Sequence, residues 1–223
     1  GTGSVASTGG ASAAIGAGAQ ATGNDSFAVG WDAKATGSTS TAIGNRTTAS
    51  GSKSIALGSS DTKATANSAV AIGESASSEG EGAVALGKES RATGGAAVAL
   101  GQKSSATNSD SFAVGWGSNA SGERSTSIGH SSAASASNSI AFGSSAKAVG
   151  ARSMAFGSSS TAKQNDDIAF GAEAATRDQG GGRSIAIGVG AMSGSNRDGF
   201  DRNGADAGGV AIGTGAYTGV NLD

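Results

Sequence analysis

The sequence predicts an all-β protein that folds as a solenoid of parallel strands. Three observations support this prediction: short apolar runs recur every 14 residues along the 223-residue chain, large and small residues alternate within each run, and a glycine closes each run. Alternation with a period of two is typical of strands, and a fixed short repeat is typical of stacked turns. We expect about 14 repeats over residues 11–215, within one domain that spans residues 1–223.

The glycines that close the apolar runs, here called the marker glycines, define the repeat. They share the period of the apolar runs, apart from one extra residue within 59–67 and longer steps before the last two. We therefore expect a regular stack with one slip near residue 60 and an irregular loop at about 189–209. Each marker glycine is expected at a tight corner, because glycine reaches positive φ angles at little cost. The marker glycines are Gly16, Gly30, Gly44, Gly58, Gly73, Gly87, Gly101, Gly115, Gly129, Gly143, Gly157, Gly171, Gly188 and Gly213.

The residue before each marker glycine is always large and apolar, and these residues are here called the apolar column. We assign the column to the structural core, and the sequence leaves open whether it lines the interior of the roll or a contact between subunits. Three successive phenylalanines in the column are expected to stack as a ladder. The column consists of Ile15, Val29, Ile43, Leu57, Ile72, Leu86, Leu100, Val114, Ile128, Phe142, Phe156, Phe170, Ile187 and Ile212.

A second alternating segment follows each corner. Small residues such as Ala19 and Ala21 are expected to point inward, and variable residues such as Gln20 and Lys34 outward. In the first strand an alanine, or once Ser127, precedes the apolar column and points to the opposite face. Each repeat is thus strand, turn, strand, turn. A turn this small encloses little apolar volume, so we expect an obligate oligomer.

The composition excludes several classes of function. The chain has 40 glycines, no proline, no cysteine and a formal net charge of −2. Without a basic cluster we expect no binding to nucleic acid, and without an apolar run of roughly 18 residues we expect no membrane span in this chain. We expect no cofactor and no metal.

Two tryptophans stand out because the hexapeptide SFAVGW occurs twice and holds both of them. Trp31 and Trp116 each follow a marker glycine, at a position that is otherwise polar and variable, so we expect exposed corners. Exposed indoles often mark contacts. Each tryptophan is a candidate ligand-binding residue; the alternative is that its ring covers a neighbouring turn or subunit.

The segment 189–209 is unusually charged for this chain. Arg197, Asp198, Asp201 and Arg202 are candidate ligand-binding residues. The aspartates, together with Asp206, have oxygens suited to calcium, but their spacing matches neither an EF-hand nor a nonapeptide calcium motif. A solvated loop remains the alternative.

We expect no catalysis. His130 is the only histidine, and its own repeat contains neither an acidic neighbour nor an evident nucleophile, so we assign no catalytic residue.

The repeat resembles the head domain of trimeric autotransporter adhesins of Gram-negative bacteria. Typical copies are Ser54-Ile55-Ala56-Leu57-Gly58 and Ser139-Ile140-Ala141-Phe142-Gly143, and the resemblance covers about residues 11–215. It implies a left-handed parallel β-roll that assembles as a homotrimer. It also implies binding to host extracellular-matrix proteins, host cells or surfaces, and a location at the bacterial cell surface. We recognise no stalk, neck or membrane anchor in this sequence, so we expect outer-membrane anchoring through other parts.

Two other solenoid classes are alternatives to an adhesin. An ice-binding solenoid needs two adjacent outward columns of threonine; one column includes Thr22 and Thr36, but its partner contains Lys34, Arg91 and Lys147. A hexapeptide-repeat acyltransferase has a six-residue period, which is much shorter than the period found here. The expected function is therefore adhesion through multivalent contacts, with an ice-binding or other single-chain solenoid as the alternative.

Overall fold

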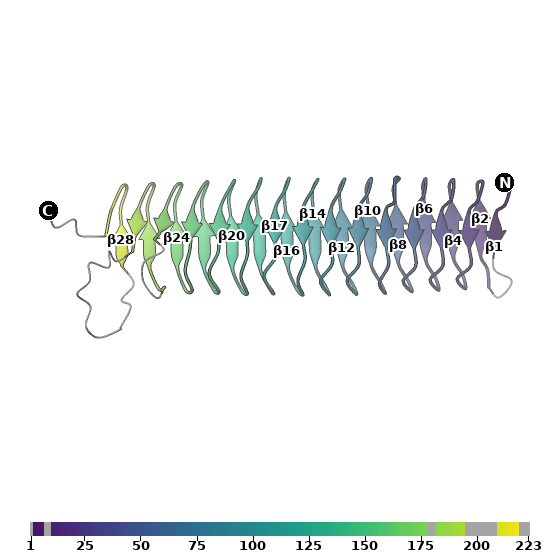
Figure 1. The fold of residues 1–223 in the computed structure, drawn as a ribbon, viewed down its shortest axis with the longest axis horizontal. Coiled ribbons are helices and arrows are strands. Elements are labelled where there is room, and N and C mark those ends of the chain that lie inside the picture. Colours follow the sequence, from purple (N-terminus) through teal and green to yellow (C-terminus); the bar gives the residue numbers. More distant parts are fainter. Residues whose placement is uncertain (1, 7–9, 178–181, 195–208, 219–223) are drawn as a thin grey trace. The chain divides into compact units, whose positions relative to one another are not determined.

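The structure is a computed structural model that describes residues 2–6, 10–177, 182–194 and 209–218. It confirms the all-β fold class: the described residues form parallel strands with ~14-residue repeats and contain no helix. The chain divides into two compact units, Gly1–Ala113 and Val114–Asp223. Figure 1 shows the strands of each unit stacked turn upon turn.

In the first unit, two-residue strands form one parallel sheet, here called the narrow sheet, and three-residue strands form a second one, here called the wide sheet. The narrow sheet contains β1 (Val5–Ala6), β3 (Gln20–Ala21), β5 (Lys34–Ala35), β7 (Thr48–Ala49), β9 (Lys63–Ala64), β11 (Ser77–Ser78), β13 (Arg91–Ala92) and β15 (Ser105–Ala106). The wide sheet contains β2 (Ala13–Ile15), β4 (Phe27–Val29), β6 (Thr41–Ile43), β8 (Ile55–Leu57), β10 (Val70–Ile72), β12 (Val84–Leu86) and β14 (Val98–Leu100).

The second unit repeats the arrangement, and β16 (Phe112–Val114) contains the boundary between the units. Its narrow sheet contains β17 (Asn119–Ala120), β19 (Ala133–Ala134), β21 (Lys147–Ala148), β23 (Thr161–Ala162), β25 (Ala175–Thr176) and β27 (Met192–Ser193). Its wide sheet contains β18 (Thr126–Ile128), β20 (Ile140–Phe142), β22 (Met154–Phe156), β24 (Ile168–Phe170), β26 (Ile185–Ile187) and β28 (Val210–Ile212).

Strands pair in strict register, each residue beside its equivalent one repeat away. Val84, for example, lies beside Val98, and Ala85 lies beside Ala99. The predicted slip occurs between β8 and β10, where Ile55 lies beside Val70, one position further along the chain than in a regular repeat. The extra residue is therefore absorbed outside the strands, and the register of the wide sheet is preserved.

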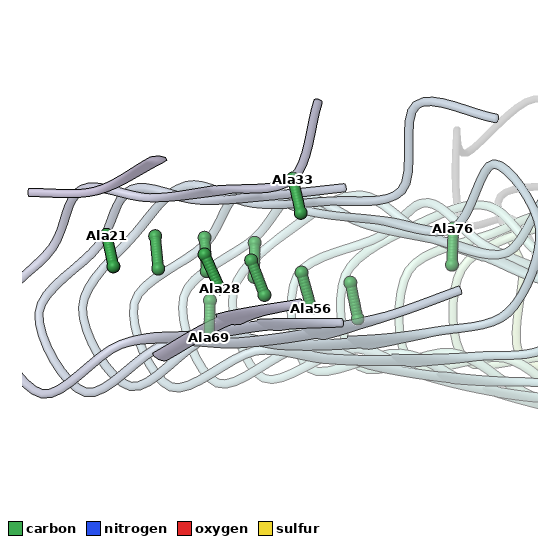
Figure 2. Packing of buried hydrophobic residues seen from close by; sticks show 11 residues of the cluster. Ala21, Ala28, Ala33, Ala56, Ala69 and Ala76 are labelled. Atoms are coloured by element: carbon green, nitrogen blue, oxygen red, sulfur yellow. The ribbon is translucent and has the colours of Figure 1, made fainter. Parts of the chain in front are cut away.

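The interior between the two sheets is filled with alanine. Figure 2 shows part of this cluster, in which Ala21, Ala28, Ala33, Ala56 and Ala69 are completely buried. A similar alanine cluster fills the second unit. The largest completely buried side chains are threonines and Asp167. The sheets lie so close together that nothing bulkier than these side chains is accommodated.

The apolar column lies outside this interior, on the outer face of the wide sheet, so its members form no core within a single chain. Its members are half-buried or exposed, with Phe170 50% and Leu86 44% exposed. The reason is volume, since the alanine that alternates with the column already fills the space between the sheets. Of the two possibilities that the sequence left open, the interior of the roll is excluded.

The marker glycines turn the chain as predicted, with positive φ at every one except Gly58. Close packing is a second reason for glycine: a Cβ added to Gly44 would lie 1.6 Å from the carbonyl oxygen of Gly58. The slip explains the exception, because the inserted corner has its positive φ angles at Ser60 and Asp61.

Buried hydroxyl groups complete the corners. Ser26 and Ser54 donate from Oγ to the carbonyl oxygens of Gly23 and Gly51, both at 2.7 Å. These bonds satisfy carbonyl groups that the turn removes from the strand ladders. In the second unit, the buried carboxylate of Asp167 likewise satisfies backbone groups. It accepts hydrogen bonds from the backbone N–H groups of Gln164 and Ser184, each at 2.8 Å.

The predicted loop at 189–209 is only partly described. Val189 to Gly194 belong to a regular corner and to β27. Arg197, Asp198, Asp201, Arg202 and Asp206 lie outside the described residues. In the described part of the chain there is no helix long and apolar enough to cross a membrane.

Candidate interaction surfaces

The outer face of the wide sheet is apolar in each unit. Two columns of side chains point outward from it: the apolar column, and the residues two positions earlier, such as Phe27, Ile55, Ile140 and Met154. Neither column contains a charged residue. Contiguous apolar surface of this kind is uncommon on a monomer and marks an interaction site.

The outer face of the narrow sheet has the opposite character. Its outward residues are mostly polar or charged, with Gln20, Lys34, Thr48 and Arg91 in the first unit and Lys147 in the second. Each unit thus has one apolar and one polar outer face. The lysines and arginines also interrupt the threonine-rich surface that an ice-binding solenoid needs.

The phenylalanine ladder forms as predicted, although on the outside of the wide sheet. The ring centroids of Phe142 and Phe156 are 4.6 Å apart with an interplanar angle of 4°, and those of Phe156 and Phe170 are 5.0 Å apart at 8°. In-register pairing of β20, β22 and β24 causes this stacking. The ladder adds a continuous aromatic strip to the apolar face of the second unit.

The two tryptophans lie on exposed corners between the sheets, 57% exposed for Trp31 and 46% for Trp116. Their surroundings differ. Trp116 stacks on His130, one repeat later, with ring centroids 4.7 Å apart and an interplanar angle of 12°. Its ring therefore covers a neighbouring turn, one of the two alternatives for these residues, whereas no aromatic ring stacks on Trp31 among the described residues.

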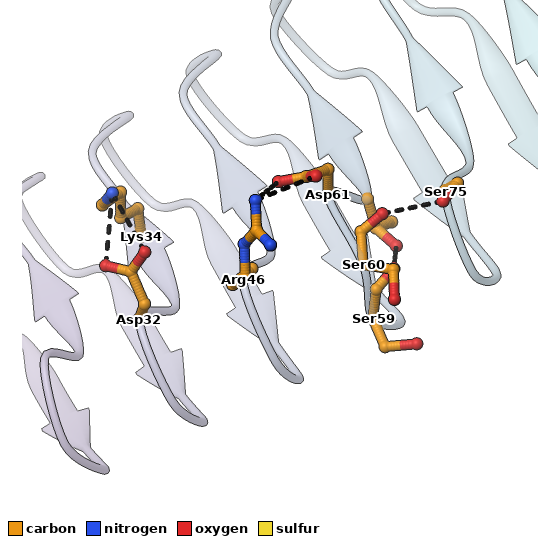
Figure 3. Close-up of polar contacts among 8 residues, drawn as sticks. Asp32, Lys34, Arg46, Ser59, Ser60, Asp61 and Ser75 are labelled. Atoms are coloured by element: carbon orange, nitrogen blue, oxygen red, sulfur yellow. Dashed lines mark hydrogen bonds and ion pairs between the residues drawn. The ribbon is translucent and has the colours of Figure 1, made fainter.

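Charged side chains pair along the same row of corners, as Figure 3 shows for the first unit. Lys34 Nζ lies 3.2 Å from Asp32 Oδ1, and Arg46 Nη2 donates to both carboxylate oxygens of Asp61 at 3.1 Å. All four side chains are substantially exposed. Exposed pairs of this kind contribute little to stability individually.

Hydrogen bonding between turns shifts the pKa of three charged groups. The hydrogen bond from Arg152 lowers the pKa of Asp166 and raises the pKa of Arg152 itself. The hydrogen bond with Glu74 raises the pKa of Lys88. The described residues contain no group of three or more His, Cys, Asp or Glu placed to hold a metal ion.

Two features of the corners were not anticipated from the sequence. Many non-glycine residues adopt positive φ at one fixed position of each corner, among them Asp25, Thr39 and Lys53. Gly18, Gly82 and Gly117 occupy equivalent positions in other corners. These glycines are the feature of the sequence that could have indicated positive φ angles there. The Arg46–Asp61 pair was also not predicted, and the single inserted residue near Asp61 is the feature of the sequence that could have indicated it.

Comparison with known families agrees with this architecture. A family model described as the YadA head domain repeat (2 copies) matches residues 7–33, 35–60, 64–90, 92–118, 120–146 and 148–174, which is more than half of the chain. A search among curated proteins found no match. Each matched segment spans about two of the turns described above. The chain therefore belongs to the YadA head domain family, the family that forms the heads of trimeric autotransporter adhesins.

Proposed function

We propose that this chain is the adhesive head of a bacterial surface protein and assembles as a homotrimer through the apolar faces of its wide sheets. The contrast between the apolar and polar outer faces of each unit carries this proposal. Burying exposed apolar side chains contributes about 25 cal/mol per Å² removed from water. The uncharged columns allow identical copies to approach without electrostatic repulsion.

The remaining surface is then available for a host partner. The polar outer face of the narrow sheet and the exposed corners would be presented three times in the trimer. Contacts that are weak in one copy gain strength when several engage one surface. Extracellular-matrix proteins, host cells and other surfaces offer such repeated sites, and a left-handed roll anchored to the outer membrane through other parts of the protein completes the proposal.

The test asks whether adhesion depends on the apolar face of the wide sheet. Leu86→Asp places a charge on the apolar face, and Leu86→Met keeps the same position apolar. Each purified protein is passed over immobilised collagen and fibronectin, and dissociation is followed by surface plasmon resonance. We expect slow dissociation from at least one surface for the unmodified protein and for Leu86→Met, and dissociation at least tenfold faster for Leu86→Asp. Equal dissociation of all three, or binding to neither surface, would contradict the proposal.

A further inference from the structure

The corner that contains Trp31 differs from the other described corners of the first unit. Its indole is 57% exposed, and the equivalent residues one repeat before and after are Ala17 and Asn45, both exposed. The alanine is too small to cover an indole, and the Asn45 side chain makes no hydrogen bond to the described residues. The corner thus offers an apolar ring beside an unengaged amide.

Further hydrogen-bonding groups lie next to Trp31 in the chain and at the next two corners of the same row. Asp32 directly follows Trp31 and is held by Lys34, with Nζ 3.2 Å from Oδ1. The backbone N–H of Arg46 donates to the carbonyl oxygen of Trp31 at 2.8 Å, which places these two residues side by side. The Arg46 guanidinium is in turn held by Asp61 (Figure 3). The four charged groups sum to zero.

The only slip in the regular spacing over residues 16–171 lies in the same row of corners. The inserted corner has positive φ at Ser60 (53°) and Asp61 (69°), and Ser75 Oγ donates to the carbonyl oxygen of Ser60 at 2.7 Å. This arrangement presents Asp61 to Arg46. In repeat proteins an insertion within one repeat often maps to the binding face.

We infer that the Trp31 corner, formed by Trp31, Asp32, Asn45 and Arg46, is a binding site for a neutral saccharide. A pyranose ring has one face of C–H groups, which are attracted to the electron-rich face of an indole, and an edge of hydroxyl groups. The carboxylate accepts hydrogen bonds from hydroxyls, the guanidinium donates to them, and the amide does both. This site rests on the proposed function and assigns a ligand class to one part of the exposed surface.

The chemistry of the corner favours a saccharide over a protein partner. A stable protein contact buries roughly 800 Å² on each side around a cluster of apolar anchors. Trp31 is instead a single aromatic ring whose neighbours in its own row are Ala17 and Asn45. The balanced charges give no attraction for a charged polymer.

The second copy of SFAVGW is a matched control inside the same chain. Trp116 has His130 stacked on it, where Trp31 has Asn45. The next residue is Gly117, so the carboxylate of Asp32 has no equivalent. The same hexapeptide therefore occurs once with a complete set of polar groups and once with a covered ring.

The experiment uses these two tryptophans as reporters. The whole chain is labelled with 5-fluorotryptophan and yields two fluorine NMR signals, which Trp31→Phe and Trp116→Phe assign. Lactose, chitotriose and mannotriose are then titrated separately. We expect at least one of them to shift the Trp31 signal saturably, with half-saturation on the order of 1 mM, and to leave the Trp116 signal in place. Asp32→Ala and Asn45→Ala should each weaken this binding about tenfold.

Three outcomes would overturn the inference: no shift with any of the three saccharides, equal shifts of both signals, or a Trp31 shift that Asp32→Ala and Asn45→Ala leave unchanged. A Trp31 signal that responds to collagen or fibronectin but to no saccharide would make the corner a protein contact. That result would support the proposed adhesive function and refute the saccharide site. Saccharide binding without retention on either immobilised protein would instead count against the matrix-binding function.

Discussion

At the scale of the residue, the marker glycines serve two purposes at once. Gly44 has φ of 125°, a value that side-chain-bearing residues rarely adopt, and its Cα faces the backbone of the next turn. Gly95 has neither constraint, since nothing lies within 4 Å of the position where a Cβ would be built. The two positions therefore separate a required glycine from a tolerated one.

Replacing Gly44 by alanine should be strongly destabilising. We expect the free energy of unfolding to fall by roughly 2–6 kcal/mol, from backbone strain together with the clash against Gly58. Gly95→Ala should leave the free energy of unfolding unchanged or raise it by up to about 1 kcal/mol. Urea unfolding followed by circular dichroism measures both, and equal midpoints for the two variants would refute the explanation.

The pair formed by Arg152 and Asp166 predicts a pH dependence with a definite sign. Because the pKa of Asp166 is lowered in the folded protein, the pair stabilises the fold above the ordinary aspartate value of 3.8. That contribution is lost as the pH falls through the lowered value. Arg152→Gln should return the pKa of Asp166 toward its ordinary value, as followed by NMR titration of its carboxyl carbon; an unaltered titration would show that Arg152 is not the cause.

At the scale of the element, most strands place neighbouring residues in two different environments, one between the sheets and one on the outer face. On β7, Ala49 is completely buried between the sheets while Thr48 points to the outer face of the narrow sheet. The interior accepts alanine, serine and threonine, but only where each fits the space already present. Adjacent residues on one strand should therefore respond very differently to the same substitution.

Valine introduced at these two positions tests the division. We expect Ala49→Val to lower the free energy of unfolding by about 1–3 kcal/mol, because it overpacks a filled interior. Thr48→Val, on the same strand, should change it by less than about 0.5 kcal/mol. Thermal melting of both variants decides the matter, and a larger loss at Thr48 would reverse the assignment of the two faces.

The elements also show which features of the fold could be predicted from the sequence alone. Period-two alternation predicted the strands, the alanine positions and the Phe142–Phe156–Phe170 ladder, because each depends only on spacing. Alternation is symmetric, however, and does not say which face is inside. Choosing the alanine face required knowing how closely the two sheets approach. The stack of Trp116 on His130 and the pairing of Arg46 with Asp61 depend on corner geometry, which spacing does not specify.

At the scale of the whole molecule, the central claim is that the apolar faces of the wide sheets are buried between copies of the chain. No other part of the chain covers these faces in the described structure, since members of the apolar column such as Ile15, Leu86 and Phe170 remain exposed. The interior that each turn does bury consists mainly of alanine, with serine and threonine, and these side chains contribute little apolar area. We therefore expect assembly to supply stability that a single copy lacks.

The mass of the purified protein in solution, measured by light scattering, tests this claim most directly. One chain has a mass of 20.8 kDa, and a trimer has three times this mass. We predict the trimer mass for the unmodified protein. We predict the same mass for Thr48→Asp, because this substitution adds its charge to the polar face of the narrow sheet. A folded, β-rich species with the mass of a single chain would contradict the account, because its apolar faces would then be stable in water without a partner.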